Sequence, residues 1–206
     1  MFVHSAEREA AIHLLSFFPD ISLTVDEYLR QRTIIQEQRW PSVPLLPGIA
    51  RLVQHLVKHA IPFAIATGSR RKAAELKMSG HPEVFKHFID KGLIACADDG
   101  VVTRGKPNPD IYLYAAQALL GRNVGPVDAA PSELSTKENE ERLKGLVFED
   151  AIPGMQAGKR AGMNVVWVPD AHLRELEYNG VERADQTVAS IEEFIPEQWG
   201  LPPYSS

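Results

Sequence analysis

The chain has 206 residues, of which 44% are hydrophobic and 24% are charged. This composition is ordinary for a globular protein and excludes a disordered or collagen-like chain. The net charge of −5 argues against a nucleic-acid-binding protein, which would present a basic face. With Cys96 as its single cysteine, the chain forms no internal disulfide and no cysteine-rich zinc site.

The length favours one domain with a small accessory lobe. The sequence contains no apolar run of the roughly 18 residues that a membrane span requires. The N-terminal segment has early glutamates and no basic start, which is not typical of a signal peptide. We therefore expect a cytoplasmic protein that binds neither membranes nor nucleic acid.

Two helices are predicted at the N-terminus, and no strand is predicted before them. Ser5 precedes a predicted helix at 6–17, and Thr24 precedes another at 25–39. Thr24 and Glu27 fit a capping box, in which each side chain bonds the backbone amide of the other. The first helix segment carries several apolar side chains: Ala10, Ile12, Leu14, Leu15 and Phe18.

From residue 46 onward, short apolar strands alternate with amphipathic helices. Apolar side chains at helical spacing follow Pro47, at Ile49, Leu52, Val53, Leu56 and Val57. Strands are predicted at PFAIATGS, GLIACADD, GLVFED and NVVWVPD and near 186–189, with helices at SRRKAAELK, PNPDIYLYAAQALL and AIPGMQAGKRAG and near 190–195. Near-continuous apolar strands separated by helices indicate an α/β fold with a parallel sheet and helices on both faces.

Residues 121–145 differ from this pattern because they are polar, mix both charge signs and contain Pro126 and Pro131. We interpret this segment as a long exposed loop between a helix and the next strand.

Ligands of open parallel sheets bind outside the carboxyl ends of the strands, and three polar groups are expected there. The first is Thr67-Gly68-Ser69, which offers a hydroxyl and, at the predicted start of a helix, two amides that favour an anion. A plain helix cap would produce the same pattern, so phosphate binding is one of two interpretations.

The second group is Lys106 in the sequence GKPNPD. Pro107 restricts the backbone beside it, Asn108 is a candidate cap for a helix that starts at Pro109, and Asp110 lies in the first turn. A lysine at such a junction suits a phosphate oxygen or a carboxylate. An ordinary surface lysine is the alternative.

The third group is the adjacent pair Glu149 and Asp150 after an apolar strand. Two carboxylates at a strand end suit Mg²⁺, which prefers oxygen ligands, although helix-capping acids are an equal alternative. Gly154 and Gly158 allow close packing in the helix that follows. Hydroxyl, lysine and acid pair together predict a phosphate pocket with a metal platform.

Other residues give weaker evidence for a functional site. His55 and His59 are spaced four apart but point away from the apolar helix face, which predicts surface histidines. Cys96 lies in an apolar strand and is expected to be a buried core thiol. The basic run 70–72 is expected to be a solvated face, and we assign no chemistry to the pair 98–99.

These motifs resemble the haloacid dehalogenase-like phosphatase superfamily. TGS resembles its second motif, GKPNPD its third and FEDAIPGMQAGKRAGM its fourth. Similarity is greatest to the pseudouridine-5′-phosphatase-like subgroup, through LLPGIARLVQHLVKHAIPFAIATGS, GKPNPDIYL, LVFEDAIPGMQAG, MNVVWVPD and WGLPPY. The resemblance covers about residues 1–206 and implies a Rossmann-like core at 46–206, with 1–45 as a partial helical cap.

The resemblance also implies roles for the site residues. Thr67 would hold the transferring phosphoryl group, and Lys106 would neutralise the charge of the phosphate and the nucleophile. Asp150 would bind Mg²⁺, with Glu149 as a co-ligand or a neighbour of the ligands. The substrate would be a small phosphorylated metabolite, such as a nucleotide phosphate or a sugar phosphate.

The first motif of the superfamily is missing, because no Asp-x-Asp sequence occurs before Thr67. Asp20 and Asp26 lie around the predicted N-terminal helices and do not follow an apolar strand. We expect the central first strand and the nucleophile to be absent, as in an N-terminally incomplete form. Loss of such a nucleophile typically lowers the rate by about 10⁴–10⁶, so we expect little or no turnover and a weakened Mg²⁺ site.

Two alternatives to an impaired Mg²⁺-dependent phosphomonoesterase remain. One is a non-catalytic protein that binds phosphorylated ligands or a partner. The other, within the superfamily, is a phosphoglucomutase-type transferase.

Overall fold

Five short parallel strands form the centre of the molecule in a computed structural model that describes residues 3–205. β1 (Ile65–Thr67) pairs with β2 (Ile94–Cys96) in one sheet. β3 (Leu146–Glu149), β4 (Asn164–Trp167) and β5 (Gln186–Thr187) form a second sheet in that order. The predicted parallel α/β arrangement is confirmed. Within residues 3–205, no strand pairs with both β1 and β3, so the two sheets remain separate.

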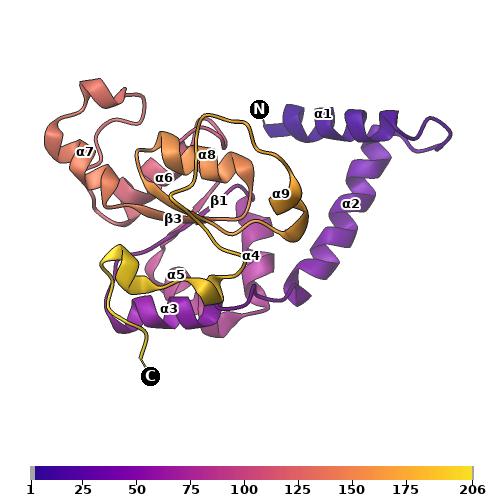
Figure 1. Ribbon diagram of the computed structural model, residues 1–206. Coiled ribbons are helices and arrows are strands. Elements are labelled where there is room, and N and C mark those ends of the chain that lie inside the picture. The colour runs from indigo at the N-terminus through magenta and orange to yellow at the C-terminus, as the bar shows by residue number, and fades with distance from the viewer. Residues whose placement is uncertain (1–2, 206) are drawn as a thin grey trace.

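Helices cover the strands on both sides, as predicted (Figure 1). α6 and α8 lie on one side of the strands and α3 and α5 on the other. The helices of the core are α3 (Ile49–Lys58), α4 (Arg71–Ser79), α5 (Pro82–Lys91), α6 (Asp110–Tyr114), α8 (Ile152–Arg160) and α9 (Ala171–Glu175). A π-helical segment, η2 (Ala115–Leu119), continues α6, and short 3₁₀ turns, η4 (Ile191–Glu193) and η5 (Pro196–Trp199), follow β5.

Strand β4 shows why this chain folds into layers. Val165 and Val166 are both fully buried, but they belong to different apolar clusters. Val165 packs in the cluster of Ile111 and Met155 from α6 and α8, whereas Val166 packs in the cluster that includes Leu56 of α3. Successive side chains of a strand point to opposite faces, so an unbroken apolar run is buried on both. Each such side chain contributes about 1.5–3 kcal/mol relative to exposure.

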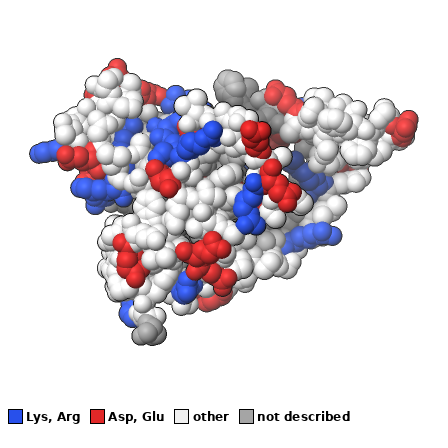
Figure 2. Space-filling view, in the orientation of Figure 1, with Lys and Arg blue, Asp and Glu red and all other residues white. Residues whose placement is uncertain are grey.

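The N-terminal helices form an arm beside this core (Figure 1). The arm consists of α1 (Val3–Ser16) and α2 (Val25–Arg39), and the turn η1 (Trp40–Ser42) leads from it to the core. Several of its apolar side chains are exposed: Ile12, Leu14, Phe17, Phe18 and Ile21. Much of the arm's surface in Figure 2 is uncharged, whereas basic and acidic side chains are interspersed over the core on that face.

The predicted cap of α2 is confirmed only in part. The Thr24 hydroxyl accepts a hydrogen bond from the Glu27 amide at 3.2 Å. The Glu27 carboxylate does not return to the Thr24 amide; it accepts hydrogen bonds from Arg30 and Gln31 instead. The predicted return bond from the Glu27 carboxylate to the Thr24 amide is therefore wrong. Arg30 and Gln31, one turn further along the same helix, engage the carboxylate instead.

The prediction of a long exposed loop at 121–145 is wrong for much of that segment. It contains a 3₁₀ turn, η3 (Pro131–Glu133), and a helix, α7 (Thr136–Leu143). Ser135 and Glu138 form a reciprocal capping box at the start of α7. Arg142 is only 3% exposed and donates to the Val124 carbonyl at 2.7 Å and the Pro126 carbonyl at 2.8 Å. These polar contacts anchor a segment that apolar periodicity does not detect.

The surface position predicted for His55 is also wrong. His55 is 5% exposed because the C-terminal segment covers it, and its Nε2 atom hydrogen-bonds the Pro202 carbonyl at 2.9 Å. The Tyr204 ring packs 4.7 Å from the His55 ring, and Lys58 donates to the Ser205 hydroxyl at 2.6 Å. The helix side that lacks apolar residues is thus a docking face for the end of the chain.

Among the described residues, no helix combines the length and the apolar character needed to cross a bilayer.

Candidate functional site

The loop after β1 places the first predicted group at the carboxyl end of the first sheet. Thr67 is half-buried, and its Oγ1 atom accepts a hydrogen bond from the Ser69 amide at 3.1 Å. Helix α4 begins only at Arg71, so the prediction that the amides of Gly68 and Ser69 start the helix is wrong. The turn closed by the Thr67 hydroxyl delays the helix by two residues.

A buried carboxylate fixes the loop that carries Lys106. Asp110 is 2% exposed and accepts hydrogen bonds from the Thr103 hydroxyl at 2.9 Å, the Arg104 amide at 3.1 Å and the Arg104 guanidinium at 2.8 Å. Burial alone raises the pKa of Asp110, but the hydrogen bonds from Arg104 and Thr103 outweigh it and leave the pKa below its ordinary value. The loop from Arg104 to Asp110 is therefore held at both of its ends.

The predicted role of Asn108 as a helix cap is wrong. Its Nδ2 atom donates to the Gly105 carbonyl at 3.0 Å, and Pro109 occupies the capping position of α6. The Lys106–Pro107 peptide is cis. Asn108 thus closes a turn within the loop and does not cap the helix.

Lys106 joins the two sheets at their carboxyl ends. Its Nζ atom donates to the Ala66 carbonyl at 3.1 Å and forms an ion pair with Glu149. Ala66 lies in β1 and Glu149 ends β3, so one ammonium group bridges strands that do not hydrogen-bond to each other. The second and third predicted groups therefore meet beside the first, as the positions of their strands predict.

Glu149 is the inward-facing member of the acid pair. Its side chain is 8% exposed, and Oε1 accepts hydrogen bonds from Lys106 and from the Tyr112 hydroxyl. Its Oε2 atom accepts the amides of Asp150 at 3.2 Å and Ala151 at 3.4 Å. A Cβ atom at Gly154 would overlap this carboxyl group, so the predicted close packing at Gly154 is confirmed.

Tyr112 is a site residue that the sequence did not predict. It is 8% exposed, and Lys106 Nζ lies 4.8 Å from the centre of its ring. Burial and the negative charge of Glu149 raise the pKa of Tyr112, so its hydroxyl remains a proton donor. In the sequence, it is one more aromatic residue in an apolar helix segment, and that pattern indicates only a core position.

Asp150 faces the solvent. Its backbone carbonyl accepts a hydrogen bond from Trp167 Nε1 at 3.0 Å, whereas its carboxylate has no hydrogen-bond partner among the described side chains of residues 7–205. The two neighbouring acids therefore differ: the Glu149 oxygens are all engaged, and the Asp150 oxygens are open.

A second acidic cluster lies at the end of β2, where Cys96, Asp98 and Asp99 place potential ligand atoms within 4.8 Å of one another. Arg71 engages both carboxylates, through its amide to Asp98 at 2.8 Å and its guanidinium to Asp99 at 2.9 Å. Arg71, in the run 70–72 predicted as a solvated face, thus pairs within the chain while its side chain stays 40% exposed. Cys96 is fully buried, as predicted, and burial raises the pKa of its thiol.

Comparison with known proteins decides the family. The sequence model of the haloacid dehalogenase-like hydrolase family matches residues 22–162, which is more than half of the chain. The chain belongs to the haloacid dehalogenase-like hydrolases. The predicted superfamily is therefore confirmed.

Individual relatives agree with this haloacid dehalogenase-like assignment. The chain is 40% identical over 185 residues to (DL)-glycerol-3-phosphatase 2 of Arabidopsis thaliana, covering 89% of this chain and 67% of that protein. It is 37% identical over 186 residues to the "Probable pseudouridine-5'-phosphatase" of Drosophila melanogaster, covering 90% of this chain and 71% of that protein. The predicted pseudouridine-5′-phosphatase-like subgroup is thus confirmed.

A solved structure shares the fold. CbbY from Rhodobacter sphaeroides, determined in complex with phosphate, superposes with a TM-score of 0.56 at 25% identity. The match covers 84% of this chain and 67% of that chain. The Rossmann-like fold class predicted from the sequence is confirmed by this similarity.

Proposed function

We propose that this haloacid dehalogenase-like chain binds the phosphate group of a small phosphorylated metabolite. Where the site also holds a carboxylate nucleophile, it would hydrolyse the phosphate ester. The observation that carries the proposal is Lys106, which is held between the end of β1 and the carboxylate that ends β3. Relatives named as phosphatases of glycerol 3-phosphate and pseudouridine 5′-phosphate support this substrate class.

The local geometry supports a separate task for each side chain. The Thr67 hydroxyl and the adjoining backbone of Gly68 and Ser69 would contact phosphate oxygens, and Lys106 would neutralise their charge. Glu149 would hold the lysine in place through its ion pair, so it would act beside the ligand set and not within it. Residues 1–45 would form the part of a helical cap that contacts the rest of the substrate.

The donor set fits a Mg²⁺ ion through Asp150. Its carboxylate is exposed, carries no partner in the described part of the chain and lies at the carboxyl end of β3. Mg²⁺ prefers such oxygen ligands and shares its coordination with substrate phosphates. When bound, the ion would supply positive charge beside the phosphate. Glu149 fits less well, because each of its oxygens already accepts two hydrogen bonds.

We further propose that the 206 residues by themselves bind phosphate esters with little or no turnover. Transfer through an aspartyl-phosphate requires a carboxylate nucleophile, and residues 1–66 contain no Asp-x-Asp sequence. The same observation favours a second candidate function, a non-catalytic protein that binds phosphorylated ligands through Thr67 and Lys106.

Release of inorganic phosphate, measured together with calorimetric binding, tests both proposals. Glycerol 3-phosphate and pseudouridine 5′-phosphate would each be incubated with the purified chain and Mg²⁺. We expect saturable binding with phosphate release about 10⁴-fold or more below that of an active phosphatase. Rapid release would overturn the inactivity proposal and support hydrolysis. If neither ester binds, both candidate functions are overturned.

A further inference from the structure

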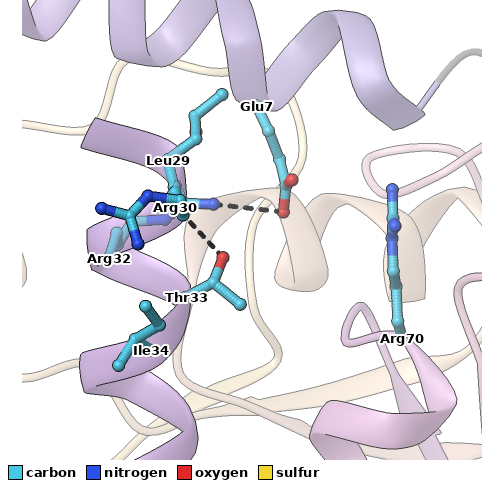
Figure 3. Close-up of a pocket in the computed structure, with 7 residues that line it drawn as sticks. All are labelled: Glu7, Leu29, Arg30, Arg32, Thr33, Ile34 and Arg70. Atoms are coloured by element: carbon cyan, nitrogen blue, oxygen red, sulfur yellow. Dashed lines mark hydrogen bonds and ion pairs between the residues drawn. The ribbon is translucent and has the colours of Figure 1, made fainter. Parts of the chain in front are cut away.

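A cavity of about 380 Å³ opens between the helical arm and the start of α4 (Figure 3). Arg32 lies on α2, and Arg70 is the residue that precedes α4. The Glu7 side chain of α1 points into the cavity between them. Leu29 and Ile34 of α2 form an apolar part of the cavity lining. The cavity therefore combines two cationic side chains from different parts of the fold with a small apolar surface.

The two guanidinium groups have spare hydrogen-bonding capacity. Arg32 has a buried Nε atom without a partner in the described residues, and its nearest carboxylate oxygen, on Glu7, lies 3.5 Å from its terminal nitrogen. Among the side chains of residues 7–205, which the structure describes, the Arg70 side chain makes no hydrogen bond or ion pair. The unpaired buried Nε atom of Arg32 is costly, and the partly buried guanidinium of Arg70 adds a second positive charge, so the pair favours an anionic partner. Arg30 also lines the cavity, but Glu27 engages it.

The cavity adjoins the proposed phosphate site through the chain itself. Arg70 follows Thr67 by three residues, and three residues span at most about 11 Å even when fully extended. The remaining atoms of a small ligand whose phosphate contacts Thr67 and Lys106 are thus within reach of Arg70.

We propose that this cavity binds a second anionic group, a carboxylate or a second phosphate, of the phosphorylated ligand. The proposal rests on the proposed function and specifies its substrate class as short phosphorylated acids or bisphosphates. Arg32 and Arg70 hold the second anion from opposite sides. The Glu7 carboxylate, which makes a long contact with Arg32, occupies the position proposed for the second anion. Glu7 therefore competes with the ligand.

Three ligands of the same carbon length test the proposal by calorimetry on the full chain with Mg²⁺. Glycerol 3-phosphate has one anionic group, whereas 3-phosphoglycerate adds a carboxylate and glycerol 1,3-bisphosphate adds a phosphate. We expect at least one of the last two to bind about tenfold more tightly than glycerol 3-phosphate, which is the size of one hydrogen bond to a charged group. The stronger of the two identifies the second anion.

Single variants separate the cavity from general charge effects. Arg70→Gln and Arg32→Gln should each abolish most of this tenfold preference and leave glycerol 3-phosphate binding unchanged. Glu7→Gln should increase the preference, an outcome that a purely structural role of this residue would not produce. Arg39→Gln is the matched control, because Arg39 lies exposed on α2 outside the cavity and should change neither value.

The outcomes distinguish the two proposals. Equal binding of all three ligands, with no effect of the Arg32 and Arg70 variants, would overturn the second-anion site while the proposed function stands. A preference that Arg39→Gln reduces as much as Arg70→Gln would also overturn it, since the effect would then be net charge. Absence of binding by every ligand would overturn the proposed function and this inference with it.

Discussion

At the residue scale, the neighbouring acids Glu149 and Asp150 show how position separates identical chemistry. Both are carboxylates at one strand end, and the sequence suggests a shared metal role for them. The structure turns Glu149 inward to Lys106 and Tyr112 and leaves Asp150 open to solvent. Gly154 makes this possible because it leaves room for the Glu149 carboxyl group.

Gly154→Ala should destabilise the fold, although alanine is the better helix former by about 1 kcal/mol. Its methyl group would displace Glu149 from Lys106, and we expect a net loss of about 2 kcal/mol or more in the free energy of unfolding. Urea denaturation measures it. Gly68→Ala is the control, because a Cβ atom there meets nothing within 4 Å. A Gly154→Ala protein as stable as the parent would contradict this packing.

The Asp110 carboxylate predicts a specific pH dependence of stability. Its folded-state pKa lies below the unfolded value of about 3.9, so its ion pair with Arg104 stabilises the fold above that value. This contribution is lost as the pH falls through the folded-state pKa. Asp110→Asn should therefore be less stable at pH 7, and its free energy of unfolding should fall less on acidification from pH 5 to pH 2. Parallel pH profiles would refute the assignment.

The roles of the two acids can be separated by Mg²⁺ binding. Asp150→Asn should weaken Mg²⁺ binding in the presence of a phosphate ester by about tenfold or more, with unchanged stability, because its side chain is exposed. Glu149→Gln should mainly lower stability, because it weakens the buried ion pair with Lys106. Calorimetry and thermal unfolding measure these effects. A reversed pattern would assign the metal to Glu149.

At the element scale, apolar patterns predict the strands well. They do not predict elements that are held in place by polar contacts. β1, β3 and β4 lie within the predicted apolar segments because burial on both faces imposes an unbroken apolar run. Helix α7 was missed because its attachment depends on the buried guanidinium of Arg142 and on a capping box. The buried position of His55 was missed because it depends on a segment about 150 residues away in the chain.

Arg142→Leu should release the segment before α7. It would leave the carbonyls of Val124 and Pro126 without their donors, which we expect to cost about 2–4 kcal/mol. Thermal unfolding and hydrogen exchange of residues 121–130 measure the effect. Leu143→Ala changes the next side chain, which is 60% exposed, and should be nearly neutral. Equal effects of the two variants would contradict the anchoring role.

At the scale of the whole molecule, the site was predictable where topology alone determines it. Carboxyl ends of parallel strands meet at one edge, and Lys106 contacts Ala66 of β1 and Glu149 at the end of β3 there, as predicted from the strand order. Tyr112 and the cavity between Arg32 and Arg70 depend on how helices pack, and no local pattern encodes that packing. The contacts by which Lys106 bridges the two sheets are likewise visible only in three dimensions.

The most direct test of the central claim is a calorimetric titration of glycerol 3-phosphate, with Mg²⁺, into the parent chain, Lys106→Met and Thr67→Val. We predict saturable binding to the parent and affinities at least tenfold weaker in both variants, because each removes a direct phosphate contact. Lys91→Met, which removes an exposed lysine from the end of α5, should bind like the parent. Equal affinities of the parent and both site variants would contradict a phosphate site at the carboxyl ends of β1 and β3.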